Sequence, residues 1–274
     1  MTAEQSRLKS RLDRVEAHLG LRPSGSKPGP PFYGHAPASG MHRLKDVWNQ
    51  MEYLVAQCNW LSDELELAIS ATHAQAPDRP SKGKKFCLKK RISQARPENG
   101  RERQLEWDLI DQWRFGNNVS NAEHKLFHRL VGFQVPVYDN VSRDGWDKID
   151  LVGVDPGGEP VVIELKSLKA SDKPLRVILE GVAYAIALQK VWPMFCEELA
   201  SVMTECNPNQ MPQHFHVCLL APRNNWERWE ENINNEDGAR ESLVRLIGRL
   251  GEHGFVLRCG SIGKNNELSL VDFP

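Results

Sequence analysis

The chain has 274 residues, a formal net charge of −1 and 40% hydrophobic residues, which allows one large domain or a domain with an appendage. A net charge near zero gives no overall basic character, so any nucleic-acid site must come from local charge. The amino terminus lacks the apolar core of a signal peptide, and no segment is apolar enough to span a bilayer. No membrane contact is therefore expected.

The cysteines are scattered along the chain and form no Cys-x-x-Cys pair, which argues against a zinc ribbon and against a disulfide framework. We expect free thiols, as in a protein of the reducing cytoplasm. The six positions are Cys58, Cys87, Cys196, Cys206, Cys218 and Cys259.

The first 40 residues divide into a short helix and a linker. In residues 1–20, Leu8, Leu12, Val15 and Leu19 alternate steps of four and three, which predicts a short amphipathic helix with coiled-coil spacing that ends at Gly20. Residues 21–40 are rich in Pro, Gly and Ser and predict a linker.

Residues 41–75 predict a long amphipathic helix. Apolar residues keep the same alternation from Leu44 to Ala68, and Trp48 and Val55 widen the stripe. This face must pack against the first helix, the downstream domain or a second copy of the chain. A homodimer through 41–75 and an intramolecular packing both remain open.

Residues 76–103 concentrate basic charge in a chain that has almost none overall. One interpretation is an arm that contacts nucleic-acid phosphates with sequence-independent, salt-sensitive affinity. The other is a solvated linker. The candidate contacts are Lys84, Lys85, Lys89, Lys90 and Arg91.

Residues 104–274 have a globular pattern that alternates helical and strand periods. We expect an α/β domain with a sheet flanked by helices. The expected helices cover about 105–113, 120–131, 171–191 and 237–251, and the expected strands cover 132–138, 149–154, 161–165, 214–221, 254–259 and 268–273.

A hairpin at 149–165 is the centre of this domain. Its two strands are β-branched and apolar, as suits a sheet covered on both faces, and Asp155-Pro-Gly-Gly has the composition of a tight turn. If the loop is 156–158 and Asp155 faces Glu159, then Asp150 lies opposite Glu164. A loop of two or four residues would offset them.

In this register the two carboxylates are close, and Lys166 shares the face of Glu164. Neighbouring carboxylates among apolar strands repel and are costly to desolvate, so a divalent hard cation is the usual compensation. Lys166 would add a positive charge suited to a phosphate oxygen or a developing hydroxide. The alternative is an ordinary hairpin with Asp150 at a strand edge and a surface pair of Glu164 and Lys166.

The pattern of Asp150 followed by Glu164-Leu-Lys166 after a Gly-containing hairpin resembles the PD-(D/E)XK nuclease superfamily. The sequence of the two hairpin strands is similar to its RecB-like and NucS-like branch. The resemblance covers roughly 104–274. It implies a restriction-endonuclease-like fold and a Mg²⁺- or Mn²⁺-dependent endodeoxyribonuclease acting on DNA. It further implies that Asp150, Glu164 and the carbonyl of Leu165 hold the metal while Lys166 assists the attacking water.

Three further site residues come from the same resemblance. A helix before the Asp strand often carries a metal-adjacent Glu, which Glu123 matches, although Ser120 and Glu123 also form a capping box. Relatives place Gln and Tyr one turn apart on the helix after the Lys. Here Glu180 replaces the Gln before Tyr184, so Glu180 is a possible additional acid and Tyr184 a possible phosphate contact or a core residue.

Other interpretations stay open. The same fold could be a non-catalytic module that binds nucleic acid or protein, or the chain could act as a scaffold through its N-terminal helices. A dimer would suit cleavage of both strands of a duplex. The pairs His124/His128 and His214/His216 lack an evident third ligand, so no metal site is expected at either.

Overall fold

The computed structural model describes most of the chain from residue 101 onward and part of the helical region before it. The described residues are Trp48, Met51, Glu52, Val55, 62–76, 101–113, 126–137, 148–167, 172–200, 211–235 and 238–273. The expected helix at 1–20, the linker at 21–40 and the basic stretch around Lys84–Arg91 lie outside them.

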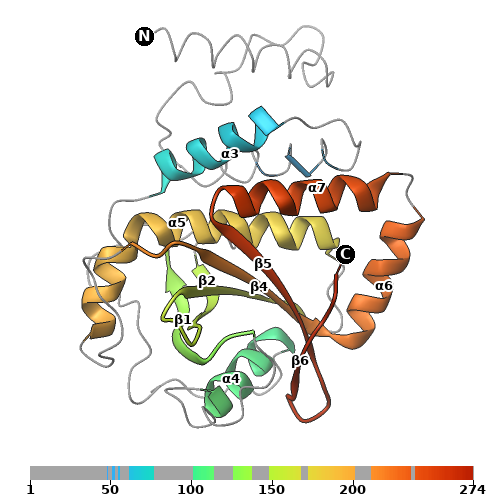
Figure 1. The fold of residues 1–274 in the computed structure, drawn as a ribbon. Helices are drawn as coiled ribbons and strands as arrows, with labels where there is room; N and C mark the ends of the chain where they lie inside the picture. Colours follow the sequence, from blue (N-terminus) through green and yellow to red (C-terminus); the bar gives the residue numbers. More distant parts are fainter. Residues whose placement is uncertain are drawn as a thin grey trace, which may run out of the picture.

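A six-stranded mixed sheet forms the centre of the molecule, and its strands lie in sequence order from β1 to β6 (Figure 1). β1–β2, β2–β3 and β5–β6 pair antiparallel, whereas β3–β4 and β4–β5 pair parallel. The strands are β1 (Arg129–Pro136), β2 (Lys148–Val154), β3 (Pro160–Leu165), β4 (Phe215–Pro222), β5 (Phe255–Ile262) and β6 (Leu268–Leu270).

Helices cover both faces of this sheet (Figure 1). The parallel pairs require crossover connections, which the helices supply: α5 (Pro174–Ala200) joins β3 to β4, and α6 (Arg223–Asn234) with α7 (Ala239–Glu252) joins β4 to β5. α4 (Arg101–Trp113) lies on the opposite face. α3 (Ser62–Gln75) packs outside α5, so the chain forms an α/β layered structure.

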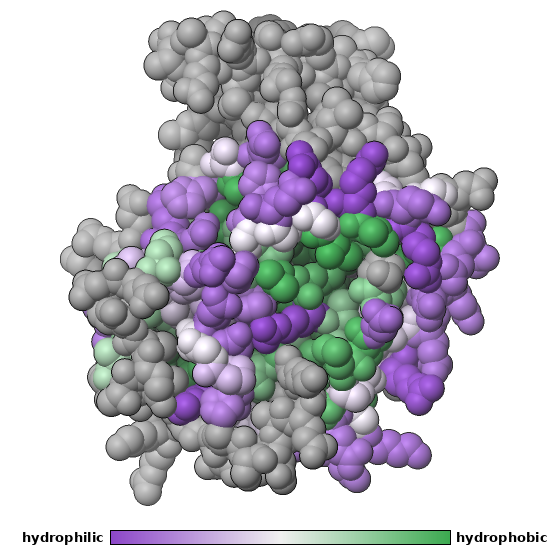
Figure 2. All heavy atoms as spheres, viewed as in Figure 1, coloured by the Kyte–Doolittle hydropathy of each residue, from purple (hydrophilic) through white to green (hydrophobic). Residues whose placement is uncertain are grey.

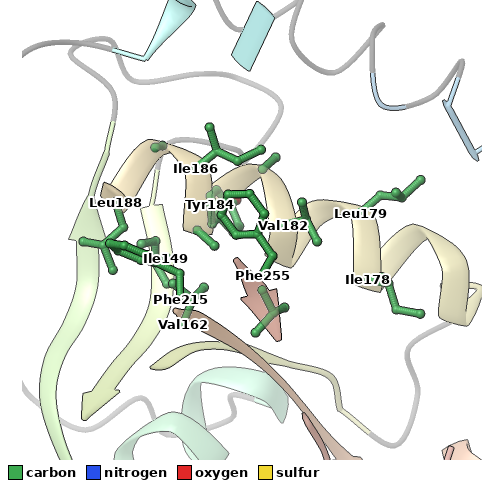
Figure 3. Close-up of a cluster of buried hydrophobic side chains, with 14 of the residues drawn as sticks. Ile149, Val162, Ile178, Leu179, Val182, Tyr184, Ile186, Leu188, Phe215 and Phe255 are labelled. Carbon is green, nitrogen blue, oxygen red and sulfur yellow. The ribbon is translucent and has the colours of Figure 1, made fainter. Parts of the chain in front are cut away.

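Two hydrophobic cores lie on the two sides of the sheet. The larger one contains the buried faces of α3, α5, α6 and α7, and Figure 3 shows the part of it around α5, which includes Val182, Ile186 and Phe255. The smaller one lies under α4 and contains Leu109, Ile110 and Trp113. β3 is buried along its whole length because it is covered on both faces.

The α/β class with a mixed sheet flanked by helices is confirmed, as are the central hairpin and the strands near 214–221 and 254–259. The helix after Lys166 begins at Pro174 as Pro at a first turn predicts, and extends through Pro193 to Ala200. The helix expected over 120–131 is wrong at its carboxyl end, because Leu130 and Val131 belong to β1. Their apolar run is too short to separate a helix from a buried strand by period.

The stripe expected at 41–73 packs within the chain. Trp48 Nε1 donates to Thr72 Oγ1 at 3.0 Å, although 24 residues separate them. On one straight helix they would be about 36 Å apart, so the described residues do not lie on a single helix. Trp48, Met51 and Val55 are buried in the larger core, while the homodimer stays a prediction.

Apolar side chains gather near the centre of the face in Figure 2 and are bordered by polar residues. Among the described residues the exposed large hydrophobic side chains are Met211, Val244 and Leu270. The helices of the described part include none that is both long and apolar enough to cross a membrane. Cys196, Cys218 and Cys259 are buried, and none of these three forms a disulfide.

Two helix glycines allow a test of how closely α5 packs on the sheet. A Cβ at Gly181 would lie 2.6 Å from Val217 Cγ1, whereas one at Gly248 on α7 would meet nothing within 4 Å. We expect Gly181→Ala to lower the free energy of unfolding by about 1 kcal/mol or more. Overpacking costs about 1–3 kcal/mol, which exceeds the gain in helix propensity. Gly248→Ala should raise it by about 0.5–1 kcal/mol. Urea unfolding of both variants checks this, and equal effects would contradict the close approach.

Candidate functional site

The register of the central hairpin brings its two acids together. Leu151 pairs with Ile163 and Val154 with Pro160, so the next position along the ladder places Asp150 opposite Glu164. The Leu165 N–H donates to Asp150 Oδ2 at 3.1 Å, which ties the first acid to the strand that carries the second. The predicted opposition of Asp150 and Glu164 is thus present.

The turn that sets this register is built around Asp155. Its Oδ1 accepts the N–H groups of Gly157 and Glu159 at 2.9 and 3.0 Å. The Asp155 N–H donates to the Glu159 carbonyl, and the Gly158 N–H donates back to Asp155 O. Gly158 has φ 83°, a conformation that glycine adopts without steric cost. An Asp side chain that bonds its own following backbone is a common device for fixing a turn.

Lys166 lies between two carboxylates. Its Nζ is 2.6 Å from Glu164 Oε1 and 3.7 Å from Glu180 Oε2 on α5. The side chains of Glu164 and Lys166 are almost fully buried, so this is not the surface pair of the alternative interpretation. The expected additional acid Glu180 therefore joins Asp150, Glu164 and Lys166 in one cluster.

Helix α4 adds acids from the other side of the sheet. Gln134 on β1 donates from Nε2 to Glu106 Oε1 at 3.1 Å and approaches Asp150 Oδ1 at 3.5 Å. Glu102, one turn before Glu106, accepts the Ser167 N–H at 3.1 Å. The cluster therefore collects side chains from β1, β2, β3, α4 and α5, at the end of the sheet where β3 finishes.

Burial keeps the carboxyls of this cluster from ionising readily. Burial, opposed by Lys166 and the Leu165 N–H, raises the pKa of Asp150 to about 7. Burial and the neighbouring Asp150 raise the pKa of Glu106 to about 8 and that of Glu164 well above its ordinary value. Burial also raises the pKa of Glu180. Several acids with raised pKa values in one place are typical of functional sites.

Lys166 shows the opposite balance. Burial by itself would lower the pKa of its ammonium, but Glu164 and Glu180 more than offset this, and the pKa lies above its ordinary value. The amine therefore keeps its proton. A single ammonium leaves negative charge uncompensated when the surrounding carboxyls ionise.

Two buried carboxylate oxygens of the cluster lack a hydrogen-bond donor among the described residues. They are Glu164 Oε2 and Glu106 Oε2. A buried acceptor without a partner is costly, and such groups need an explanation in an ordered structure. Clustered carboxylate oxygens are the donor set that Mg²⁺ and Mn²⁺ prefer, so the residues present fit a hard divalent cation.

Other predicted residues lie apart from the cluster or outside the described residues. Tyr184 is only 2% exposed and belongs to the larger core, which favours packing over contact with a phosphate (Figure 3). Glu123 and the basic residues Lys84, Lys85, Lys89, Lys90 and Arg91 lie outside the described residues. The metal role of the Leu165 carbonyl stays a prediction.

Sequence reasoning missed Glu102, Glu106 and Gln134. The two glutamates could have been found from the sequence. Leu109, Ile110 and Trp113 form the buried stripe of α4, and Glu106 and Glu102 continue it toward the amino end at helical spacing. A carboxyl on the buried face of a helix is rarely accidental. Gln134 carried no such signal, since its position depends on the backbone of β1.

A second polar group lies at the other end of the hairpin, roughly 16 Å away along β3. Asp155, Glu159 and His216 place their ligand atoms within 4.8 Å of one another, so this group could hold a metal. His216 thus finds the partners that sequence reasoning did not expect. However, Arg258 Nη2 already lies 3.2 Å from Asp155 Oδ2 and 3.1 Å from His216 Nε2, so a cation is in place.

No family model, curated protein or solved structure matches this chain in the comparisons made. The interpretation of the site therefore rests on its geometry and chemistry.

The pKa of Glu106 lies near 8 in the folded chain and near 4.5 when the carboxyl is exposed. Between pH 4.5 and 8 the folded state therefore binds more protons than the unfolded state. Stability is then greatest below about pH 4.5 for this group and falls as pH rises toward 8. Without metal, the unfolding free energy of wild type should fall between pH 5 and 8 by about 2–4 kcal/mol more than that of Glu106→Gln. Urea unfolding with EDTA measures this.

The same substitution at Glu227, whose exposed carboxylate lies beside Arg223 on α6, is the matched control. It should leave the pH dependence as in wild type. Parallel pH curves for Glu106→Gln and wild type would show that Glu106 ionises freely.

Proposed function

We propose that this protein is a Mg²⁺- or Mn²⁺-dependent nuclease that hydrolyses phosphodiester bonds in DNA. The observation that carries the proposal is the cluster of half-buried Asp150 with buried Glu164 and Lys166, in which Glu164 Oε2 has no partner among the described residues. A purely structural cluster would have no reason to retain buried carboxylate oxygens without donors.

In this proposal Asp150 and Glu164 hold the cation, and Glu106 and Glu180 supply further oxygens to it or to its waters. Asp150 is prepared for this, since the Leu165 N–H fixes its Oδ2 and leaves Oδ1 with one long contact to Gln134. Bound Mg²⁺ would lower the pKa of a coordinated water and polarise the scissile phosphate. The resulting charge on the phosphate needs a nearby donor.

Lys166 is that donor. Because Glu164 and Glu180 hold its proton on the amine, it is suited to donate to a phosphate oxygen or to orient water, and unsuited to act as the general base. Its ammonium would stabilise charge that develops on the pentavalent phosphorus centre.

The architecture supports the same proposal. A mixed sheet flanked by helices agrees with the restriction-endonuclease-like fold that the Asp150…Glu164-Leu-Lys166 resemblance implies. The cluster also lies where the parallel strands β3 and β4 end, and open α/β sheets bind ligands at the carboxyl ends of their strands. DNA as the partner and the basic stretch as its arm remain part of the proposal.

Glu164→Gln should abolish cleavage of double- and single-stranded DNA in Mg²⁺. It should also weaken Mn²⁺ binding. Loss of an outer partner of a metal ligand costs about 10–100-fold in affinity, and loss of a ligand itself should cost more. Lys166→Met should reduce cleavage while retaining Mn²⁺ binding, since it removes a donor but no ligand. Gel assays and isothermal titration calorimetry measure the two effects.

Glu252→Gln, at an exposed acid on α7, is the control and should cleave and bind as wild type does. Wild-type protein that neither binds Mn²⁺ at millimolar concentration nor cuts either substrate would refute the nuclease proposal.

Metal affinity should depend on pH because the cation must compete with protons. With the pKa of Asp150 near 7 and that of Glu106 near 8, raising the pH from 6 to 8 deprotonates the ligands, and Mn²⁺ affinity should rise about tenfold or more. Titrations in buffers of different ionisation enthalpy should show proton release at pH 6.5. An affinity independent of pH would contradict protonated ligands.

A further inference from the structure

Gln134 has a backbone conformation that its residue type rarely adopts. Its φ is 47°, in the left-handed region that residues other than Gly, Asn and Asp avoid. It lies within β1, between the pairs Phe133–Leu151 and Val135–Ile149, and thus faces Asp150 across the ladder. Strained conformations of this kind persist where the surrounding structure requires them, and they cluster at functional sites.

The strain changes where side chains point. In a regular strand Phe133 and Val135 would face the same side of the sheet. Here Phe133 packs against the core under α4, whereas Val135 lies in the core under α5. Phe133 also contacts the Trp107 ring on α4, with ring centroids 5.3 Å apart. The turn of the backbone at Gln134 therefore lets its side chain reach α4 as well as β2.

The amide of Gln134 stands between two carboxyl groups. It donates to Glu106 Oε1 at 3.1 Å and approaches Asp150 Oδ1 at 3.5 Å. Holding Glu106 by Oε1 leaves its buried Oε2 without a partner. When both acids are ionised, as metal binding requires, repulsion from Asp150 would turn the Glu106 carboxylate away from the cluster if this donor were absent.

We propose that Gln134 is a positioning residue, whose amide holds Glu106 beside Asp150 so that both carboxylates face one divalent cation. The strained backbone of β1 is the means by which a strand residue reaches both acids. This inference rests on the proposed metal site and adds to it a residue that touches neither metal nor substrate. Outer partners of this kind orient ligands and commonly tune metal affinity.

Two variants at this position separate the strain from the amide. Gln134→Ala and Gln134→Gly both remove the amide, but only glycine adopts φ 47° without steric cost. We expect both to weaken Mn²⁺ binding by about 10–100-fold, and we expect the metal-free Gly variant to melt about 2–4 °C higher than the Ala variant. Calorimetry with Mn²⁺ alone and thermal unfolding in EDTA provide the two readouts.

Asn266 supplies the matched control, because it also has a positive φ of 58° but lies in the turn between β5 and β6. Asn266→Ala and Asn266→Gly should differ in melting temperature in the same direction, while Mn²⁺ affinity stays within about twofold of wild type. Circular dichroism confirms that all four variants fold.

The outcomes separate this inference from the function it rests on. Wild-type protein that binds no Mn²⁺ refutes the metal site, and this inference with it. Wild-type protein that binds Mn²⁺ while both Gln134 variants bind equally well overturns the role of Gln134 alone. Equal melting temperatures for the Ala and Gly variants at 134 overturn the strain, and weakened binding in the Asn266 variants assigns the effect to general destabilisation.

Discussion

The opposition of Asp150 and Glu164 across the β2–β3 ladder is the constraint on which the site depends. A shift of one residue in the pairing would turn one acid to the other face of the sheet. Two features prevent it. The Asp155 turn fixes the loop length, and the side chains of β3 pack alternately into the two cores, so a slip would exchange the cores that they fill. The apolar strands thus hold an acid pair that would separate if it were free to do so.

This arrangement is costly without a cation. Two carboxylates in a low-dielectric environment favour the protonated form, which is why burial raises the pKa values of Asp150, Glu106 and Glu164. Lys166 and the Leu165 N–H compensate part of this cost, yet buried oxygens of Glu164 and Glu106 remain without donors. A site that is destabilising when empty stabilises the folded chain when a ligand binds it, because the ligand binds only that state.

The sequence predicted the parts of the site that depend on local rules. Turn residues and β-branched strands determine the hairpin, and counting from Asp155 gave the correct facing of Asp150 and Glu164. The contributions of Glu106 and Gln134 could not be derived in that way. The first depends on where α4 docks, and the second depends on a positive φ that no residue preference indicates. The apolar stripe near Trp48 is buried as expected, but its packing partner was left open, because periodicity shows that a face is buried and not what covers it.

The two polar groups at opposite ends of the hairpin explain why one is the better candidate for a site. Around Asp155 and Glu159 the carboxylates find their donors within the protein, although the buried His216 Nδ1 has no partner among the described residues. Backbone N–H groups satisfy the turn, and Arg258 brings a cation that donates to both Asp155 and the Leu126 carbonyl. Such a group carries its own cation and fits a structural link between β3, β4 and β5. Around Asp150 and Glu164 the protein supplies one ammonium and leaves buried oxygens open. Because both groups belong to one hairpin, the difference does not come from burial alone. It comes from the absence, among the described residues around Asp150 and Glu164, of an arginine that bonds the acids as Arg258 bonds Asp155 and His216. A metal ion would take that place.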